Sequence, residues 1–586
     1  MNEALATAFA HHQAGRLAEA EAIYRTVLGA NPGQPQAAYL LAIALLQQGR
    51  AGEAAERFEA LLAAKPDHAD AAYHLGLARQ IEGRLEDAAA AYRWADNLGG
   101  GSVGLFLNLG AALQGLKRRA EARHAYERAL AIEPDHAGAL CNLGALWREE
   151  GRLDEALAAL DRALGGDPDS LEARQNRALV RRELGDGEGA IADYRALLAK
   201  APERIEAWIN LGVLLKERAR WGEARQAFET ALARQPGAVE AAANLGALDL
   251  IEGRFALARQ AYDRALAIDP GHVGARFNRG FLNLLEGDYL QGFADWEARL
   301  DLPEMAPFRL QGPVWDGAPI PGTLLLQAEQ GYGDTLNFIR YATLAAKRAG
   351  RLVLRVQPAL AALFEANFGG FAQIVAQDHP PPAYDAWALM MSLPARFQTT
   401  IETIPSDVPY LAADPAKVAA WRQRLGPGGP KVGLVWRGSP GFKGEDSRSP
   451  GLAPLGPLFD VPGLQFVSLQ RGPGRAEIAA LGLAERLVDW SDPADPMVGE
   501  GFESTAALVQ TLDLVITTDT AMAHLAGALA KPVWVLLSTH PDWRWGPKGE
   551  TTPWYPTARL FRQRERGRWE AAAQALAQAL GQWAGG

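Results

Sequence analysis

The chain has 586 residues, of which 48% are hydrophobic, so it can bury several cores and we expect about two to four domains. Its formal net charge of −10 gives no general attraction for nucleic acid and argues against a nucleic-acid partner. The single cysteine, Cys141, excludes an intrachain disulfide and any multi-cysteine metal site, and we interpret it as a small buried helix residue.

The first residues, "MNEALATAFAHHQAGRL", lack a basic head followed by an apolar segment. Further along the chain, no apolar run reaches the roughly 18 residues that suggest a membrane span. We therefore expect a cytoplasmic protein without a membrane span.

A 34-residue period runs through the first half of the chain. Each unit combines a glycine register, a small alanine, a bulky residue four positions later and, in most units, a proline, which together predict two helices and a stop. The register residues are Gly15, Gly49, Gly83, Lys117, Gly151, Gly185, Ala219, Gly253 and Gly287. This pattern resembles tetratricopeptide repeats and implies an α-solenoid over residues 1–300.

Another column of the same period consists of asparagine, which is a mediocre helix former. Its members are Asn108, Asn142, Asn176, Asn210, Asn244 and Asn278. One interpretation is that each amide satisfies nearby loops or helix ends. The other is a ladder that hydrogen-bonds the backbone of an extended acceptor polypeptide, and the column is similar to the asparagine ladder of the O-linked N-acetylglucosamine transferases.

The period stops after Trp296, and a stretch rich in proline and glycine predicts a junction near residue 300. Short apolar runs such as "TLLLQ", "KVGLV" and "LDLVITT" then alternate with helical segments, which indicates parallel sheets. We expect two α/β lobes: an amino-terminal lobe over 301–410, a linker over 411–430, and a carboxyl-terminal donor-binding lobe over 431–586. A closing helix, "WEAAAQALAQALGQW", is expected to pack across the lobes.

Ligands of such sheets bind beyond the carboxyl ends of the strands, which selects three places. At Thr517 to His524 a strand ends and a helix begins, so the helix amides and the Thr518 and Thr520 hydroxyls suit a phosphate. Asp519 would repel phosphate, and we interpret it as a helix cap or as an acceptor for sugar hydroxyls. Helix capping for this whole turn, and simple packing for His524, are the competing interpretations.

The other two places are the loop after "VGLVW" and the turn "QGYGDT". The first contains Arg437, Lys443 and Arg448, which could neutralise a phosphate leaving group or form a solvated surface loop. The second contains Asp334, five residues after Glu329, and either acid could be catalytic or could cap a helix and stabilise the turn.

Four segments, "QGYGDT", "VGLVWRG", "SLQRG" and "ITTDTAMAHLAGALAKPVWVLL", together resemble the repeat-fused bacterial transferases related to the heptosyltransferases. The resemblance implies a GT-B fold with two Rossmann-like lobes and a nucleotide-sugar bound mainly to the second lobe. Ala521 stands where heptosyltransferases usually have glycine, which puts an ADP-heptose donor in doubt. The donor-binding residues that the resemblance implies are Trp436, Lys443, Arg448, Gln470, Thr518, Asp519, Thr520 and His524.

The same resemblance implies that Asp334 is the general base, with Glu329 in reserve, in a direct displacement that inverts the sugar. No metal or other cofactor is expected, because helix amides and basic side chains can carry the charge of the leaving group. Trp543, Trp545 and Trp554 could stack on a base, although we favour a packing role for them.

Repeats followed by a heptosyltransferase-like half resemble the flagellin glycosyltransferases, which implies transfer of a nonulosonic acid from a CMP donor to serine or threonine of flagellin. One alternative is a glycan or lipid-linked sugar acceptor, with the repeats recruiting a partner. Another is a scaffold whose transferase half is degenerate.

Overall fold

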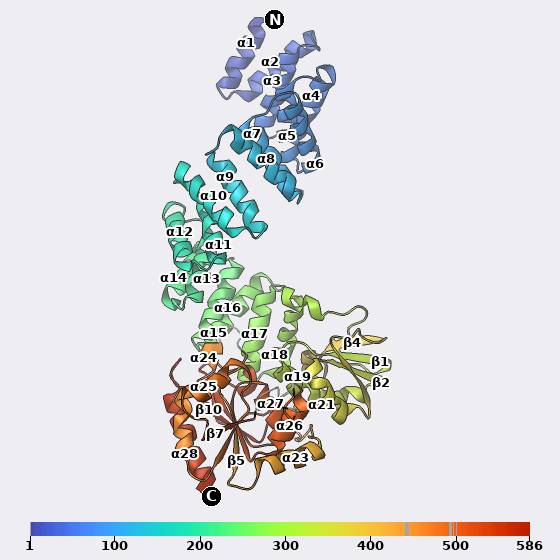
Figure 1. Ribbon diagram of the computed structural model, residues 1–586. Helices are drawn as coiled ribbons and strands as arrows, with labels where there is room; N and C mark the ends of the chain where they lie inside the picture. Colours follow the sequence, from blue (N-terminus) through green and yellow to red (C-terminus); the bar gives the residue numbers. More distant parts are fainter. Residues whose placement is uncertain (1, 440–444, 491–494, 496, 500, 586) are drawn as a thin grey trace. The chain divides into compact units, whose positions relative to one another are not determined.

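The computed structural model describes residues 2–439, 445–490, 495, 497–499 and 501–585 (Figure 1). The chain forms two compact units, Met1–Ala241 and Ala242–Gly586. The predicted α-solenoid and the two α/β lobes are both present. The second unit contains both lobes and, apart from the first residues of the helix Val239–Ile251, the last two helix pairs of the repeats.

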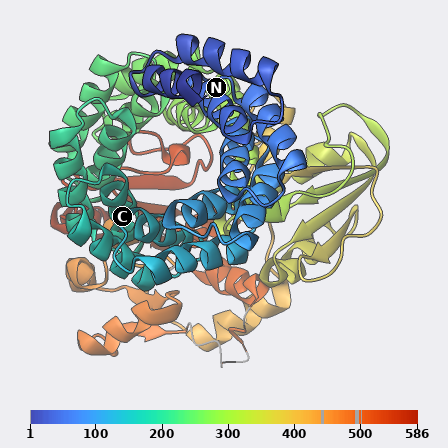
Figure 2. The ribbon, with the colours of Figure 1, turned by 90° about the horizontal axis from the view of Figure 1, so that it is seen from above.

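Eighteen helices, arranged in antiparallel pairs, make up the repeats, and those of the first unit wind into a superhelix (Figure 2). They are α1 (Asn2–Gln13), α2 (Leu17–Ala30), α3 (Pro35–Gln47), α4 (Ala51–Ala64), α5 (Ala69–Ile81), α6 (Leu85–Asn97), α7 (Val103–Gly115), α8 (Arg119–Ile132), α9 (Ala137–Glu149), α10 (Leu153–Gly166), α11 (Leu171–Glu183), α12 (Gly187–Lys200), α13 (Ile205–Glu217), α14 (Trp221–Arg234), α15 (Val239–Ile251), α16 (Phe255–Ile268), α17 (Val273–Glu286) and α18 (Tyr289–Trp296).

The glycine register marks the turn inside each helix pair. Gly15, for example, has a φ of 73°, and the two other residues of the register, Lys117 and Ala219, have φ values of 60° and 56°. Glycine adopts this left-handed conformation without strain, which explains its recurrence at the turn.

Small and bulky residues of the period pack against one another as predicted. Ala88 and Tyr92 of α6, like their equivalents in other repeats, are fully buried. Gly76 of α5 lies against the Tyr92 ring so closely that a Cβ atom there would overlap it. The column of small residues therefore lets the paired helices approach each other, and the bulky side chains fill the space between them.

Two parallel sheets form the centres of the lobes. The first has the strand order β3-β2-β1-β4 and the second β10-β9-β8-β5-β6-β7. The strands are β1 (Ile320–Gln327), β2 (Ala349–Val356), β3 (Ala372–Ala376), β4 (Ala386–Leu389), β5 (Lys431–Val435), β6 (Gln465–Ser468), β7 (Leu487–Asp489), β8 (Leu514–Thr518), β9 (Val533–Leu537) and β10 (Ala558–Arg562). The chain changes direction across the sheet between β1 and β4 and between β5 and β8, which are the points where such sheets bind ligands.

Short helices connect the strands and cover the sheets. The α-helices are α19 (Tyr332–Phe338), α20 (Ala342–Ala346), α21 (Pro358–Phe368), α22 (Leu393–Arg396), α23 (Pro415–Leu425), α24 (Glu445–Arg448), α25 (Ala476–Ala480), α26 (Phe502–Thr511), α27 (Ala521–Ala528) and α28 (Glu570–Gly585). The 3-10 helices are η1 (Glu297–Asp301), η2 (Pro303–Phe308), η3 (Ile339–Tyr341), η4 (Met390–Ser392), η5 (Ala453–Asp460), η6 (Gly472–Arg475) and η7 (Trp543–Trp545).

The last repeat helix, α18, packs directly on the donor-binding lobe. Its Phe293 ring meets Trp543 edge-on, with centroids 5.5 Å apart, and Tyr289 Oη accepts a hydrogen bond of 3.0 Å from Trp554 Nε1. Trp543, Trp545 and Trp554 are all buried, so the packing role favoured from the sequence describes their place in the structure. The end of the repeats and the transferase half thus share one core.

The closing helix α28 differs from its expected position. It packs against η5 and β10 of the donor-binding lobe, in a cluster that includes Leu434 and Leu576. The expectation that it crosses the lobes is wrong, because its apolar face is already covered by its own lobe.

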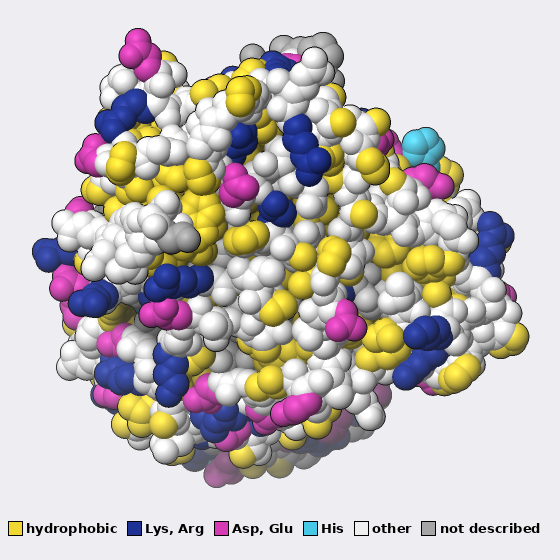
Figure 3. Space-filling model, turned by 90° about the horizontal axis from the view of Figure 1, so that it is seen from below, with side chains coloured by type: hydrophobic (Ala, Val, Ile, Leu, Met, Phe, Trp, Pro, Cys, Tyr) yellow, Lys and Arg dark blue, Asp and Glu magenta, His cyan; other side chains and the backbone are white. Residues whose placement is uncertain are grey.

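On the face drawn in Figure 3, basic and acidic side chains lie side by side with apolar ones between them.

Candidate functional site

The first helix of the amino-terminal lobe, α19, begins at the turn that contains Asp334. The Asp334 side chain caps this helix, with Oδ2 accepting a hydrogen bond of 3.2 Å from the backbone N–H of Gly331. Its other oxygen, Oδ1, accepts a hydrogen bond of 2.7 Å from Arg544 Nη2 of the donor-binding lobe. Burial raises the pKa of Asp334, while the Arg544 guanidinium opposes that rise.

Glu329 lies inside the core at the point where β1 and β4 diverge. Its two oxygens accept hydrogen bonds of 3.0 Å from the backbone N–H groups of Met390 and Met391, and Arg299 lies 3.1 Å away. Burial raises the pKa of Glu329 to about 7. A carboxyl group that is 1% exposed and holds three donors has no open path to an acceptor hydroxyl, so its place is that of a structural residue.

The donor-binding lobe presents the turn between β8 and α27. Thr520, not Asp519, is the helix cap, since Thr520 Oγ1 accepts from the backbone N–H of Met522 at 3.3 Å. Thr518 Oγ1 is buried and has no hydrogen-bond partner among the described residues. Burial, together with Asp542, raises the pKa of Asp519 to about 6, against the effect of the Arg448 and Arg544 guanidiniums.

His524, one turn into α27, is buried at the contact between the lobes. Its Nδ1 forms a hydrogen bond of 3.0 Å with the Tyr555 hydroxyl, and its ring stacks on Trp545 with centroids 5.5 Å apart. Burial lowers the pKa of His524 well below its ordinary value, and Arg544 and Arg340 act in the same direction. The imidazole is therefore neutral at physiological pH.

Helix α19, which follows β1, and helix α27, which follows β8, meet at their amino-terminal ends. A Cβ atom on Gly333 of α19 would lie only 2.9 Å from His524 Cδ2 and 3.4 Å from Ala521 Cα of α27. The approach is close enough to require glycine at residue 333, although its φ is ordinary. The structure therefore brings Asp334 and the Asp519–His524 turn to one place.

The loop after β5 is organised by two residues that the sequence analysis did not assign this role. Gln470 is buried and its Oε1 accepts from the backbone N–H groups of Trp436 and Arg437 at 3.0 and 2.8 Å. Glu445 pairs with Arg448 at 3.0 Å and accepts from Ser449 Oγ. Gln470 therefore fixes the strand end, and Glu445 anchors the start of α24.

The structure bears differently on three of the residues that were expected to contact the donor. The Trp436 side chain is fully buried in the core that α28 covers, away from a ligand. The positive charge of Arg448 lowers the pKa of Asp519, so these two side chains interact electrostatically. Lys443 lies outside the described residues.

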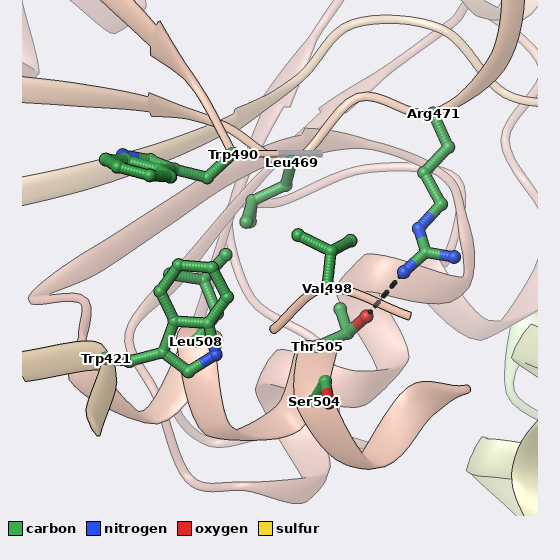
Figure 4. A pocket seen from close by; sticks show the side chains of 8 residues that line it. All are labelled: Trp421, Leu469, Arg471, Trp490, Val498, Ser504, Thr505 and Leu508. Carbon is green, nitrogen blue, oxygen red and sulfur yellow. Dashed lines mark hydrogen bonds between the residues drawn. The ribbon is translucent and has the colours of Figure 1, made fainter. Parts of the chain in front are cut away.

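A pocket lies beyond the carboxyl ends of β6 and β7 (Figure 4). It is lined by Trp421, Leu469, Arg471, Trp490, Val498, Ser504, Thr505 and Leu508. Arg471 Nη2 donates to Thr505 Oγ1 at 3.1 Å, and Trp421 meets Trp490 edge-on. None of the predicted donor-binding residues lines this pocket, so it is separate from the Asp519–His524 turn.

All six ladder asparagines are half-buried on the first helix of their pairs. Asn108 Nδ2 donates to Tyr73 Oη at 3.0 Å, and Asn176 Nδ2 lies 3.5 Å from Cys141 Sγ; both partners are 35 residues earlier. The equivalent residue for Asn142 is Leu107, which offers no polar side-chain atom. Part of the ladder is therefore tied to the preceding repeat, while Asn142 faces an apolar residue at the place where Asn108 has its tyrosine.

Cys141 is buried, and burial raises the pKa of its thiol, as expected for a packed helix residue. Among the described residues there is no group of three or more His, Cys, Asp or Glu side chains placed to hold a metal ion. Within the same part of the chain, every helix falls short of the length and apolar character that crossing a membrane requires.

The residues that sequence reasoning missed form the connection between the lobes. Arg544 contacts Asp334, Asp542 and Asn337, and Asn337 Nδ2 donates to Tyr555 Oη at 2.7 Å. The only sequence signal was a single arginine between two tryptophans in "DWRW".

Comparison with known proteins gives matches in both halves of the chain. Tetratricopeptide repeat models match residues 11–81, 107–170, 176–218 and 214–273, and the model of glycosyltransferase family 9 (heptosyltransferase) matches residues 500–572. The chain thus joins tetratricopeptide repeats to a glycosyltransferase family 9 domain. The matched part of that domain contains Thr518 to His524, Asp542 and Arg544.

A curated relative, Protein FlbA of Caulobacter vibrioides, is 31% identical over 319 residues, which is 50% of this chain and 52% of that protein. The chain therefore matches about half the length of this relative. Among solved structures, the tetratricopeptide repeat protein YrrB is 21% identical with a TM-score of 0.29, over 31% of this chain and 95% of its own. A repeat protein from Parabacteroides merdae is 17% identical with a TM-score of 0.35, over 40% and 93%.

Proposed function

We propose that the protein is a cytoplasmic glycosyltransferase that moves a sugar from a nucleotide-sugar to serine or threonine of a protein acceptor, bound by the repeats. The preferred donor is a CMP-activated nonulosonic acid and the preferred acceptor is flagellin. Both preferences rest on the resemblance of the domain arrangement to flagellin glycosyltransferases. The family 9 domain supports the transferase chemistry itself.

The observation that carries the proposal is the 2.7 Å contact between Asp334 Oδ1 and Arg544 Nη2. Together with the approach of Gly333 to His524, it supports a site that combines the acidic residue of the amino-terminal lobe with the turn that carries Asp519. An acid on one lobe and a candidate phosphate site on the other are what a displacement at the anomeric carbon requires.

In the proposed reaction, the donor phosphate lies at the amino-terminal end of α27, where the Thr518 hydroxyl has no hydrogen-bond partner within the part of the chain that the structure describes. Asp519 accepts hydrogen bonds from hydroxyl groups of the sugar. The acceptor hydroxyl attacks the anomeric carbon while Asp334 removes its proton, and the bond from that carbon to the phosphate oxygen breaks on the opposite face. Helix amides and Arg448 neutralise the leaving group, so the proposed reaction needs no metal.

The test is a transfer assay. CMP-, UDP-, ADP- and GDP-activated sugars are each incubated with the full chain and a recombinant flagellin, and the intact mass of the acceptor is measured. A mass increase equal to one or more sugars, seen with the CMP donor, supports the proposal. Unchanged mass with every donor and with several protein acceptors would instead favour a glycan or lipid acceptor, or the non-catalytic scaffold.

Asp334→Asn tests the assignment of the base. We expect turnover to fall by about 10² to 10⁴, the usual contribution of a general base, while the nucleotide still raises the melting temperature. Turnover within tenfold of the parent protein would remove Asp334 from that role.

A further inference from the structure

We propose that Arg544 is a positioning residue of the transfer reaction, which holds the Asp334 carboxylate across the lobe contact so that one oxygen faces the acceptor hydroxyl. The inference rests on the proposed function, in which Asp334 is the base. Arg544 is not among the site residues that the family resemblance implies.

The guanidinium of Arg544 has a defined partner at each nitrogen. Nη2 donates to Asp334 at 2.7 Å, Nη1 donates to Asp542 at 2.9 Å, and Nε lies 3.4 Å from Asn337 Oδ1. The side chain is 4% exposed. Its planar group also lies over the rings of Phe338 and Trp543, 4.9 and 4.5 Å from their centroids. A planar fork with these neighbours has one orientation.

The backbone of Arg544 is held as firmly as its side chain. Its N–H donates to Asp542 Oδ1 at 3.0 Å, and its carbonyl accepts from Thr552 Oγ1 at 2.7 Å. Asp542 therefore fixes both the main chain and the guanidinium. The folded donor-binding lobe thus holds Arg544 in place, and Arg544 in turn orients the Asp334 carboxylate.

The two oxygens of Asp334 differ in the strength of the hydrogen bonds they accept. Oδ1 accepts the charge-assisted 2.7 Å hydrogen bond from Arg544, whereas Oδ2 accepts a longer one of 3.2 Å from the neutral Gly331 N–H. Each oxygen keeps one lone pair, and Oδ2, which has the weaker donor, is the more basic of the two toward an acceptor hydroxyl. Without Arg544 the carboxyl group would be oriented by the Gly331 N–H alone, and it would rotate more freely about its terminal torsion.

Several charged or titratable groups surround the Asp334–Arg544 pair. They are Asp542 on the same loop, Asp519 and His524 at α27, Glu329 after β1, Arg340 of η3, Arg448 of α24, and the hydroxyl groups of Tyr289 and Tyr555. Asp542 raises the pKa of Asp334, whereas Arg544 lowers it. Removal of the Arg544 charge should therefore raise the pKa of Asp334, and the acidic limb of kcat/KM should move to higher pH.

The experiment compares Arg544→Gln and Arg544→Lys with a matched control, Arg562→Gln, in the full chain. Arg562 donates to the carbonyls of Trp545 and Gly546 at 2.6 and 3.0 Å, so its loss loosens the same loop without touching Asp334. In Arg544→Gln we expect the acidic limb to rise by about one to three pH units, which is the usual effect of a neighbouring opposite charge. Arg544→Lys keeps a charge without the fork and should show a smaller shift with a lower kcat. Arg562→Gln should leave the limb in place.

A second measurement does not need activity. Melting temperatures of Asp334→Asn, Arg544→Gln and the double variant form a cycle, and the two losses should be clearly non-additive. Additive losses overturn the inference even if the chain transfers no sugar, in which case the proposed function has failed separately. If the parent protein is active, an unmoved acidic limb in Arg544→Gln also overturns it.

Discussion

Glu329 and Asp334 are acids five residues apart that both accept from backbone N–H groups and an arginine, but the Asp334 side chain is 22% exposed and that of Glu329 is fully buried. Glu329 is enclosed by backbone donors and Arg299, and its pKa of about 7 exceeds the ordinary value of 4.5. A raised pKa means that the folded state binds the proton more tightly than the unfolded state. Protonated Glu329 therefore contributes about 3 kcal/mol to the free energy of unfolding. This contribution is fully present below pH 4.5 and is lost as the pH rises to about 7.

We expect Glu329→Gln to flatten the dependence of the melting temperature on pH between about 4.5 and 7. Its amide N–H₂ would face the backbone N–H of Met390 or Met391, so the melting temperature should also fall at every pH. Because the carboxyl group is structural, turnover per folded molecule should stay within about tenfold, below the usual loss for a general base. A larger loss of turnover at an unchanged melting temperature would return Glu329 to the list of bases.

The sequence could select Asp334 but not its partner. Asp334 follows a strand in a glycine turn, a local pattern, whereas the Asp334–Arg544 contact joins residues separated by 210 positions. Glu329 and Gln470 also lie after apolar runs, where ligand contacts are expected, yet both bind backbone groups of their own lobes. A position just after a strand predicts that a residue lies near the site. Only the packing decides whether its side chain is bound by the protein itself or is available to a ligand.

The contact between α19 and α27 depends on the small size of Gly333. Its φ is ordinary, so alanine fits the backbone, but the added Cβ would lie 2.9 Å from His524 Cδ2. We expect Gly333→Ala to separate the two helix ends and to lower kcat by at least about tenfold, since small displacements at a reaction centre have large effects. The measurement is kcat together with the melting temperature.

Gly331→Ala is the matched control for this prediction. A Cβ there would lie 3.4 Å from Asp334 Oδ2, an ordinary contact, in the same turn. Equal losses in both variants would show that the turn itself, rather than the approach of α19 to α27, is what matters.

Two amides of the asparagine ladder, Asn108 and Asn142, differ in what the preceding repeat offers them. Asn108→Ala removes the hydrogen bond to Tyr73, worth about 1 kcal/mol, so the melting temperature should fall by about 3 °C. Asn142 has Leu107 at the equivalent place, so Asn142→Ala should change the melting temperature little. It should instead raise KM for the protein acceptor about fivefold, which corresponds to a lost hydrogen bond.

Acceptor kinetics and donor hydrolysis distinguish the two roles of the ladder. If neither variant changes KM for the acceptor, the asparagines serve the solenoid alone. Donor hydrolysis without acceptor should be the same in both variants and in the parent chain, since the ladder lies in the repeats.

At the scale of elements, the long periodic pattern was the most informative part of the sequence. It predicted the helix pairs, their turns and the buried columns, because each repeat presents the same signal. Apolar runs predicted six strands, whereas β3, β4, β7 and β10 were missed. These four have three to five residues each, and mixed segments such as "ARLFR" carry little strand signal.

At the scale of the whole molecule, periodicity and packing place boundaries differently. The 34-residue pattern ends near residue 300, but the second compact unit begins at Ala242. The pattern reflects the packing within and between repeats. It does not predict that the last repeat packs against the transferase lobes. Arg299, just past the last repeat helix, is 1% exposed and lies 3.1 Å from Glu329 of the amino-terminal lobe.

This shared core predicts how the chain can be divided. A fragment of residues 242–586 retains α18, whereas 301–586 loses Tyr289, Phe293 and Arg299 and uncovers Trp543 and Trp554. Each exposed tryptophan returns about 150–250 Å² to water, and Glu329 would lose the arginine that binds one of its oxygens and lowers its pKa. We expect 242–586 to melt cooperatively and to gain stability from the donor nucleotide, and 301–586 to aggregate or to lack a cooperative transition. Solubility and thermal melting followed by circular dichroism would check this. A 301–586 fragment that melts within a few degrees of the longer one would show that the final repeats are dispensable to the transferase core.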